Sequence, residues 1–119
     1  MDCVHTDTVN NLVLPNRVAL QPVDKNLLPV RLAGVLFEIT LFARQTNDFN
    51  LSPFGTDADG LVTIPRRDID AEVKSNYDSD LMGHGHVTTV PPGSRFDCCH
   101  PMTSPVPWAR ERRYGLAFS

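Results

Sequence analysis

The strongest structural signal in this sequence is the stretch Gly34-Val35-Leu36-Phe37-Glu38-Ile39-Thr40-Leu41-Phe42-Ala43. Every odd-numbered position from 35 to 41 is apolar, whereas the even-numbered positions include Glu38 and Thr40. Side chains alternate between the two faces of a β-strand, so this pattern predicts a strand with one face on a core and the other half-exposed. A mostly β fold is therefore the first expectation.

Downstream of this stretch, the sequence predicts a return strand, a tight turn and another short strand. Residues 45–48 are polar and suit a hairpin connection, and residues 49–54 are expected to form the returning strand. The run Thr56-Asp57-Ala58-Asp59-Gly60 predicts a turn, because Asp side chains bond to nearby backbone amides and glycine accepts positive φ. Residues 61–64 should then form a short strand that ends at Pro65.

One helix is predicted near residues 68–81. Its apolar positions recur at intervals of four and form a single stripe; they are Ile69, Val73, Tyr77 and Leu81. After the loop Gly83-His84-Gly85-His86, residues 87–90 are expected to form a last strand.

The two ends of the chain give weaker signals because both contain proline. Residues 12–23 alternate loosely around Pro15 and Pro22, which favours an edge strand. Five of the ten prolines lie in residues 91–119, a net-basic segment. Proline removes a backbone donor, so this segment is predicted to be an irregular C-terminal tail. Residues 1–90 are predicted to form a single β-sandwich domain.

Composition narrows the function classes. The chain has 119 residues, of which 41% are hydrophobic and 21% charged, as in an ordinary small globular domain. The net charge of −3 makes a nucleic-acid partner unlikely. No window is apolar enough for a membrane span. The N-terminus lacks a basic region followed by an apolar run, so a cytoplasmic location is expected.

The order of elements in the middle of the chain resembles the transthyretin-like (prealbumin-like) β-sandwich modules, which include the carboxypeptidase regulatory-like domains. The resemblance covers residues 30–82 and lies in the segments 34–39 and 56–65. It implies a small β-sandwich with one short helix and an accessory or binding role. The alternative is a small α+β domain in which the helix packs across an antiparallel sheet.

One enzyme has this scaffold, the hydrolase that opens 5-hydroxyisourate, which ends in Tyr-Arg-Gly-Ser. This chain ends in Tyr114-Gly115-Leu116-Ala117-Phe118-Ser119, so the arginine is missing and the serine is displaced. The sequence also lacks a Gly-x-Ser-x-Gly elbow and a glycine-rich phosphate loop. A small hydrolase is therefore kept only as a second alternative, with no catalytic residue assigned.

A cluster of possible soft metal ligands lies in the C-terminal third. The candidates are His84, His86, Cys98, Cys99 and His100. Imidazole and thiolate suit zinc, but adjacent cysteines depart from the Cys-x2–4-Cys spacing of zinc sites. Calcium is not favoured at Asp57 and Asp59, because the first and twelfth positions of an EF-hand loop would be Gly55 and Arg66. No cofactor is predicted, and zinc binding is the alternative function.

A second candidate surface lies in the C-terminal segment. It combines an aromatic and arginine set that is typical of binding hot spots: Trp108, Arg110, Arg112, Arg113 and Tyr114. In the competing interpretation, Trp108, Leu116 and Phe118 fold back to cover an open sheet edge. The three cysteines are an odd number without Cys-x-x-Cys, so reduced thiols are expected.

The sequence favours a non-enzymatic binding or protein-interaction module. Its expected partner is another protein or a second copy of the chain, bound through a sheet edge or through the Gly83–His86 loop.

Overall fold

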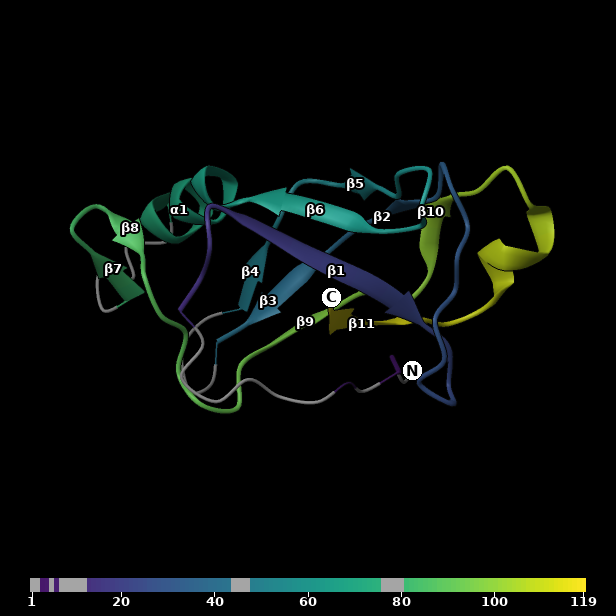
Figure 1. The fold of residues 1–119 in the computed structure, drawn as a ribbon, viewed down its shortest axis with the longest axis horizontal. Helices are drawn as coiled ribbons and strands as arrows, with labels where there is room; N and C mark the ends of the chain where they lie inside the picture. The colour runs from purple at the N-terminus through teal and green to yellow at the C-terminus, as the bar shows by residue number, and fades with distance from the viewer. Residues whose placement is uncertain (1–2, 5, 7–12, 44–47, 76–80) are drawn as a thin grey trace.

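The computed structural model describes residues 3–4, 6, 13–43, 48–75 and 81–119. These residues form a mostly β structure of several small antiparallel sheets and one short helix, with extents of 42 × 22 × 22 Å (Figure 1). The strands are β1 (Arg17–Val23), β2 (Leu36–Phe37), β3 (Thr40–Phe42), β4 (Asp48–Asn50), β5 (Phe54–Gly55), β6 (Val62–Pro65), β7 (Met82–Gly83), β8 (His86–Val87), β9 (Arg95–Asp97), β10 (Pro101–Thr103) and β11 (Gly115–Phe118). The helices are α1 (Arg66–Ser75) and the 3₁₀ helix η2 (Pro107–Glu111). No helix among the described residues is long and apolar enough to cross a membrane.

Three sheets each have three strands, and a fourth is a hairpin. The strand orders are β11-β1-β6, β10-β2-β5 and β4-β3-β9, with β7 paired to β8. All of these pairings are antiparallel.

The stretch 34–43 alternates as predicted. Its inward side chains are at most 2% exposed, and they are Val35, Phe37, Ile39, Leu41 and Ala43. Glu38 is exposed. The stretch is not one strand, however, because β2 and β3 belong to different sheets. The carbonyl of Ile39, between them, accepts a hydrogen bond from the Leu51 amide at 2.8 Å. The return segment is confirmed as β4 and β5, which pair with β3 and β2.

The Asp57 turn is confirmed and leads into β6. The Asp57 carboxylate accepts hydrogen bonds from the amides of Asp59 at 2.8 Å and Leu61 at 3.0 Å. Gly60 has φ +80°, and a Cβ added there would lie 2.8 Å from the Cα of Arg31. Glycine is therefore required at this position for two reasons, its positive φ and the approach of residue 31.

The predicted helix is present but starts earlier, at Arg66. Ile69 and Val73 are buried, as the apolar stripe requires. The described helix ends at Ser75, and the predicted continuation over residues 76–80 lies outside the described residues. Leu81, the last member of the stripe, is buried.

The prediction that residues 12–23 form an edge strand is wrong. β1 lies between β6 and β11 in its sheet. Proline is tolerated there because β6 pairs with residues 17–20, whereas β11 pairs with residues 20–23. Pro22 thus lies beyond the stretch that is paired on both sides, and its carbonyl accepts a hydrogen bond from the Val30 amide at 2.8 Å.

Residues 91–119 also differ from the expected irregular tail. This segment contains β9, β10 and β11, and it supplies one strand to each three-stranded sheet. Its prolines do not interrupt these elements. Pro101 is the first residue of β10, and Pro107 begins η2, where a missing N–H costs no helical hydrogen bond.

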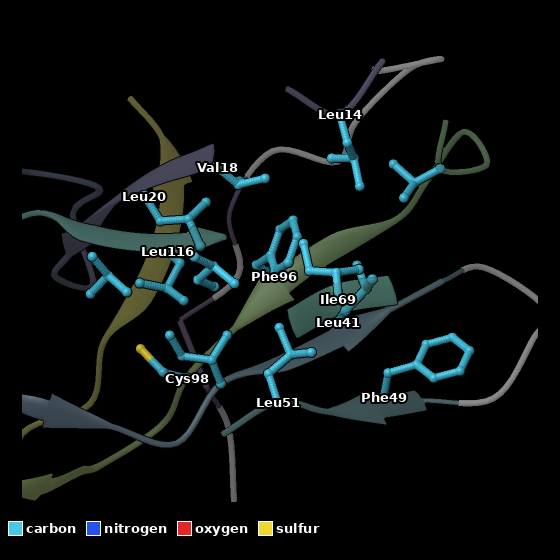
Figure 2. Packing of buried hydrophobic residues seen from close by; sticks show 14 of the residues in the cluster. Leu14, Val18, Leu20, Leu41, Phe49, Leu51, Ile69, Phe96, Cys98 and Leu116 are labelled. Atoms are coloured by element: carbon cyan, nitrogen blue, oxygen red, sulfur yellow. The ribbon is translucent and has the colours of Figure 1, made fainter. Parts of the chain in front are cut away.

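The sheets share one apolar core (Figure 2). Figure 2 shows side chains from β1, β3, β9, β11 and α1 pointing toward one another, and its labelled members include Leu20, Leu41, Ile69, Phe96 and Leu116. Phe96 and Leu116 come from the C-terminal segment, so the core includes residues from both sides of the boundary at residue 90.

Candidate functional site: a groove beside Trp108

The described residues form an open groove of about 960 Å³. We call it the Trp108 groove. Its walls come from three parts of the chain: the N-terminal residues, the loop after β1, and η2 with the residues that follow. The lining residues are Cys3, Val4, Asp24, Lys25, Asn26, Leu27, Pro29, Val30, Arg31, Leu32, Trp108, Glu111, Arg112, Arg113 and Tyr114. Figure 1 shows η2 at one end of the long axis, beside the loop that follows β1.

The first wall is shaped by a turn that begins at Asp24. The Asp24 carboxylate accepts hydrogen bonds from the amides of Asn26 at 2.9 Å and Leu28 at 3.0 Å. The Asp24 amide donates to the Leu28 carbonyl at 3.0 Å. Leu27 has φ +62°. It is the third residue after Asp24, and Gly60 has the equivalent position in the turn that begins at Asp57. The turn leaves Leu27 and Leu28 more than half exposed, at 51% and 58%.

The second wall is η2. Buried Ala109 anchors this helix, and Pro107 lies in its first turn. Trp108 is 54% exposed. The Arg112 guanidinium lies 5.1 Å from the centroid of the Trp108 ring, which is a cation–π arrangement. An aromatic ring and a cation are thus held together on the groove surface.

Tyr114 connects the groove to the core. Its amide donates to the Cys99 carbonyl at 2.9 Å, and its ring meets the Phe37 ring edge-to-face at 5.9 Å. The hydroxyl is buried and has no hydrogen-bond partner among the described residues. Burial raises the pKa of Tyr114; nearby Arg112 lowers it, and Asp24 raises it.

A disulfide fixes Cys3 and Val4 beside the groove. Cys3 bonds to Cys99, with 4.6 Å between the two Cα atoms. Gly115 allows this segment to approach, because a Cβ there would lie 2.5 Å from the Val4 carbonyl oxygen. The expectation of three reduced thiols is therefore wrong for two of the cysteines. Sequence spacing could not show the pair, since 96 positions separate the partners.

Four of the five predicted partner-binding residues line the groove. They are Trp108, Arg112, Arg113 and Tyr114. Arg110 is exposed but does not line it. In the competing interpretation, Trp108, Leu116 and Phe118 fold back over a sheet edge; Leu116 is buried, as this interpretation requires, whereas Trp108 is 54% exposed. Phe118 is 39% exposed and packs edge-to-face on Phe96.

Sequence reasoning missed the opposite wall. The overlooked residues include Lys25, Leu27 and Arg31, which line the groove across from η2. A signal was present, because Asp24-Lys25-Asn26-Leu27-Leu28 and Asp57-Ala58-Asp59-Gly60-Leu61 share the pattern Asp-x-Asx-x-Leu. The first turn was not predicted, because it has Leu27 where the second turn has Gly60.

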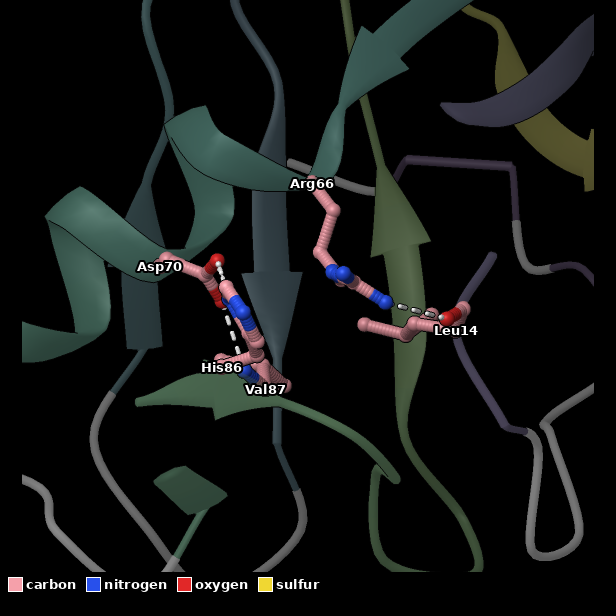
Figure 3. Close-up of polar contacts among 5 residues, drawn as sticks. All are labelled: Leu14, Arg66, Asp70, His86 and Val87. Atoms are coloured by element: carbon pink, nitrogen blue, oxygen red, sulfur yellow. Dashed lines mark hydrogen bonds and ion pairs between the residues drawn. The ribbon is translucent and has the colours of Figure 1, made fainter. Parts of the chain in front are cut away.

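The predicted metal ligands are not brought together. His84 and Gly85 have φ +54° and +82°, so they form the two-residue turn of the β7–β8 hairpin. The Nδ1 atom of His86 lies 3.1 Å from Asp70 Oδ2, and the other carboxylate oxygen of Asp70 accepts the Val87 amide at 2.6 Å (Figure 3). These contacts hold the hairpin against α1. Figure 3 also shows Arg66 reaching the Leu14 carbonyl, at 3.4 Å.

The remaining predicted ligands lie toward the other end of the molecule. Cys98, Cys99 and His100 come just before β10, whereas β7 and β8 lie at the end opposite to η2 (Figure 1). Cys98 is buried and donates to the Tyr114 carbonyl at 3.6 Å, and Cys99 is in the disulfide. Across the described part of the chain, no three or more His, Cys, Asp or Glu side chains are grouped to hold a metal ion.

Comparison with protein-family models, curated proteins and solved structures found no match. The transthyretin-like resemblance therefore stays a prediction.

Proposed function

We propose that this protein is a non-enzymatic binding module and that the Trp108 groove is its binding surface. The supporting observation is Trp108 itself, which lines this groove, is 54% exposed and has Arg112 over its ring. Tryptophan and arginine dominate binding hot spots because their side chains combine large area with polar contacts. A ligand that covers Trp108 would bury this aromatic surface.

The surroundings of Trp108 favour a protein segment as the ligand. Leu27 also lines the groove, and neighbouring Leu28 is exposed beside it. An open groove of about 960 Å³ is at the upper end of the volumes of small-molecule sites. The sequence-based alternative, a second copy paired through a sheet edge, is a different outcome that sedimentation analysis would detect as a dimer.

In this proposal the fold is a transthyretin-like sandwich, as the central segment of the sequence implies. We also propose that the protein functions in an oxidising compartment, and not in the cytoplasm as the N-terminus predicted. The Cys3–Cys99 disulfide suits an oxidising compartment, because cytosolic reductants keep most thiols reduced.

Selection from a random peptide library displayed on phage tests the proposal without assuming a ligand. Peptides selected on the wild-type protein should lose at least about tenfold in affinity against Trp108→Ala, as expected for a hot-spot residue. Met102→Ala is the matched control, since Met102 is 49% exposed and does not line the groove. Equal affinity for wild type and Trp108→Ala would contradict the proposal.

A further inference from the structure

From the charges in the groove, we infer that the Trp108 groove binds an acidic peptide segment that presents one apolar side chain to Trp108. This inference rests on the proposed function and adds the chemistry of the partner to it. Three observations carry it: the excess of positive charge in the groove, the cations there that form no ion pair among the described residues, and the exposed apolar side chains.

The groove is basic on an acidic protein. Four cationic residues line it, against two acidic ones: Lys25, Arg31, Arg112 and Arg113 against Asp24 and Glu111. The whole chain carries −3. One oxygen of the Asp24 carboxylate already accepts two backbone amides, which weakens its effect on a ligand. The excess of positive charge in the groove therefore attracts anionic ligands.

Several of these cations are available to a ligand. Among the described residues, Lys25, Arg31 and Arg112 form no ion pair with a carboxylate. Lys25 and Arg31 are exposed on one wall, and Arg112 is exposed on the other. A segment lying in the groove can thus place carboxylates toward both walls, where arginine gives charge-assisted hydrogen bonds.

The groove also has an apolar surface. Trp108 and Leu27 come from opposite walls and are both more than half exposed. Such a surface favours a leucine-like side chain flanked by acidic residues. A nucleic acid fits less well, because Asp24 and Glu111 would face its phosphates and the chain is acidic overall.

The fluorescence of Trp108 reports on the groove directly, since it is the single tryptophan of the chain. The probe is a synthetic peptide with one leucine flanked on both sides by glutamates. Matched peptides replace every glutamate with glutamine or with lysine. We expect saturable fluorescence change with the glutamate peptide, at least about tenfold weaker binding of the glutamine peptide, and weaker binding again at high salt.

Two pairs of substitutions locate the interaction. Lys25→Gln with Arg31→Gln should weaken binding of the glutamate peptide about tenfold, as expected when two exposed charge contacts are lost. Arg17→Gln with Arg67→Gln removes the same charge near the start of α1, outside the Trp108 groove, and should leave binding almost unchanged. All four side chains are exposed, so the fold should tolerate both changes.

The outcomes separate this inference from the proposed function. Glutamine or lysine peptides that bind as well as the glutamate peptide would overturn the acidic ligand. So would a single-stranded oligonucleotide that binds more tightly. If the phage selection yields neutral or basic peptides that still require Trp108, the binding module stands and the acidic partner is wrong. If no selected peptide depends on Trp108, both are wrong.

Discussion

Removing the Cys3–Cys99 disulfide should lower the stability of this protein substantially. The bond joins the N-terminal segment to the chain just before β10, across a sequence separation of 96 residues. It also holds Val4 against Gly115, at the start of β11. The perturbation is Cys3→Ser, which leaves a small polar side chain at a half-exposed position.

The expected loss follows from the loop that the bond closes. Cross-linking a loop of about 100 residues restricts the unfolded chain enough to stabilise the folded state by about 4–5 kcal/mol in the chain-entropy model. For a domain of this size, that free energy corresponds to a fall in Tm of roughly 15 °C. Lost contacts of Val4 and Thr6 with Gly115, the first residue of β11, add to the effect.

Urea unfolding followed by circular dichroism provides the measurement. Oxidised wild type should be more stable than Cys3→Ser, and adding reductant should bring wild type close to the variant. Cys98→Ser is the control for the third cysteine, and it should keep its sensitivity to reductant. Unfolding free energies of oxidised wild type and Cys3→Ser within about 1 kcal/mol of each other would refute the reasoning, because the chain-entropy effect is several times larger.

Three further predictions concern the turn, the buried thiol and the hairpin contact. Gly60→Ala should destabilise the fold by about 2–4 kcal/mol in thermal unfolding, because of the positive φ and the approach of Arg31. Gly34→Ala should cost only about 1–2 kcal/mol, because Gly34 has φ +73° but no atom lies within 4 Å of the added Cβ. Equal losses would contradict this prediction. Burial raises the pKa of the Cys98 thiol, so the folded state holds the thiol proton more tightly than the unfolded state does. Above the ordinary thiol pKa of about 8.5, the free energy of unfolding should therefore fall, relative to that of Cys98→Val, by up to about 1.4 kcal/mol per pH unit. Parallel pH profiles of the two proteins would exclude the effect. Asp70→Ala should lower the free energy of unfolding by about 2 kcal/mol and accelerate hydrogen exchange of the Val87 amide. The control Asp68→Ala should lower it by about 0.5 kcal/mol and leave that amide protected. Unchanged Val87 exchange in Asp70→Ala would argue against the contact.

Local patterns predicted the elements whose form depends on nearby residues. The alternation of residues 35–43 predicted which side chains are buried, because a strand turns each successive side chain to the opposite face. The Asp57 turn was predictable because its hydrogen bonds join residues at most four apart. The start of α1 was displaced by two residues, an error typical of helix ends.

The errors arose where distant segments decide the structure. Prolines in residues 91–119 suggested an irregular tail, yet β9, β10 and β11 form because each has a partner strand much earlier in the chain. The prolines of this segment lie at the start of an element or between elements, and composition does not reveal such placement. The candidate site shows the same limit: Trp108, Arg112 and Arg113 were recognised from the sequence, but the wall with Lys25 and Arg31 was not.

The sequence by itself determined that this protein is mostly β, which face of its central stretch is buried, and where its aspartate turn lies, because these depend on interactions between near neighbours. Only the tertiary structure decided that Cys3 meets Cys99, that Cys98 and His84 are far from forming one site, and that Trp108 and the loop after β1 line the same groove. Such contacts depend on how separate strands pair and how their apolar faces are buried together. No local pattern records that arrangement.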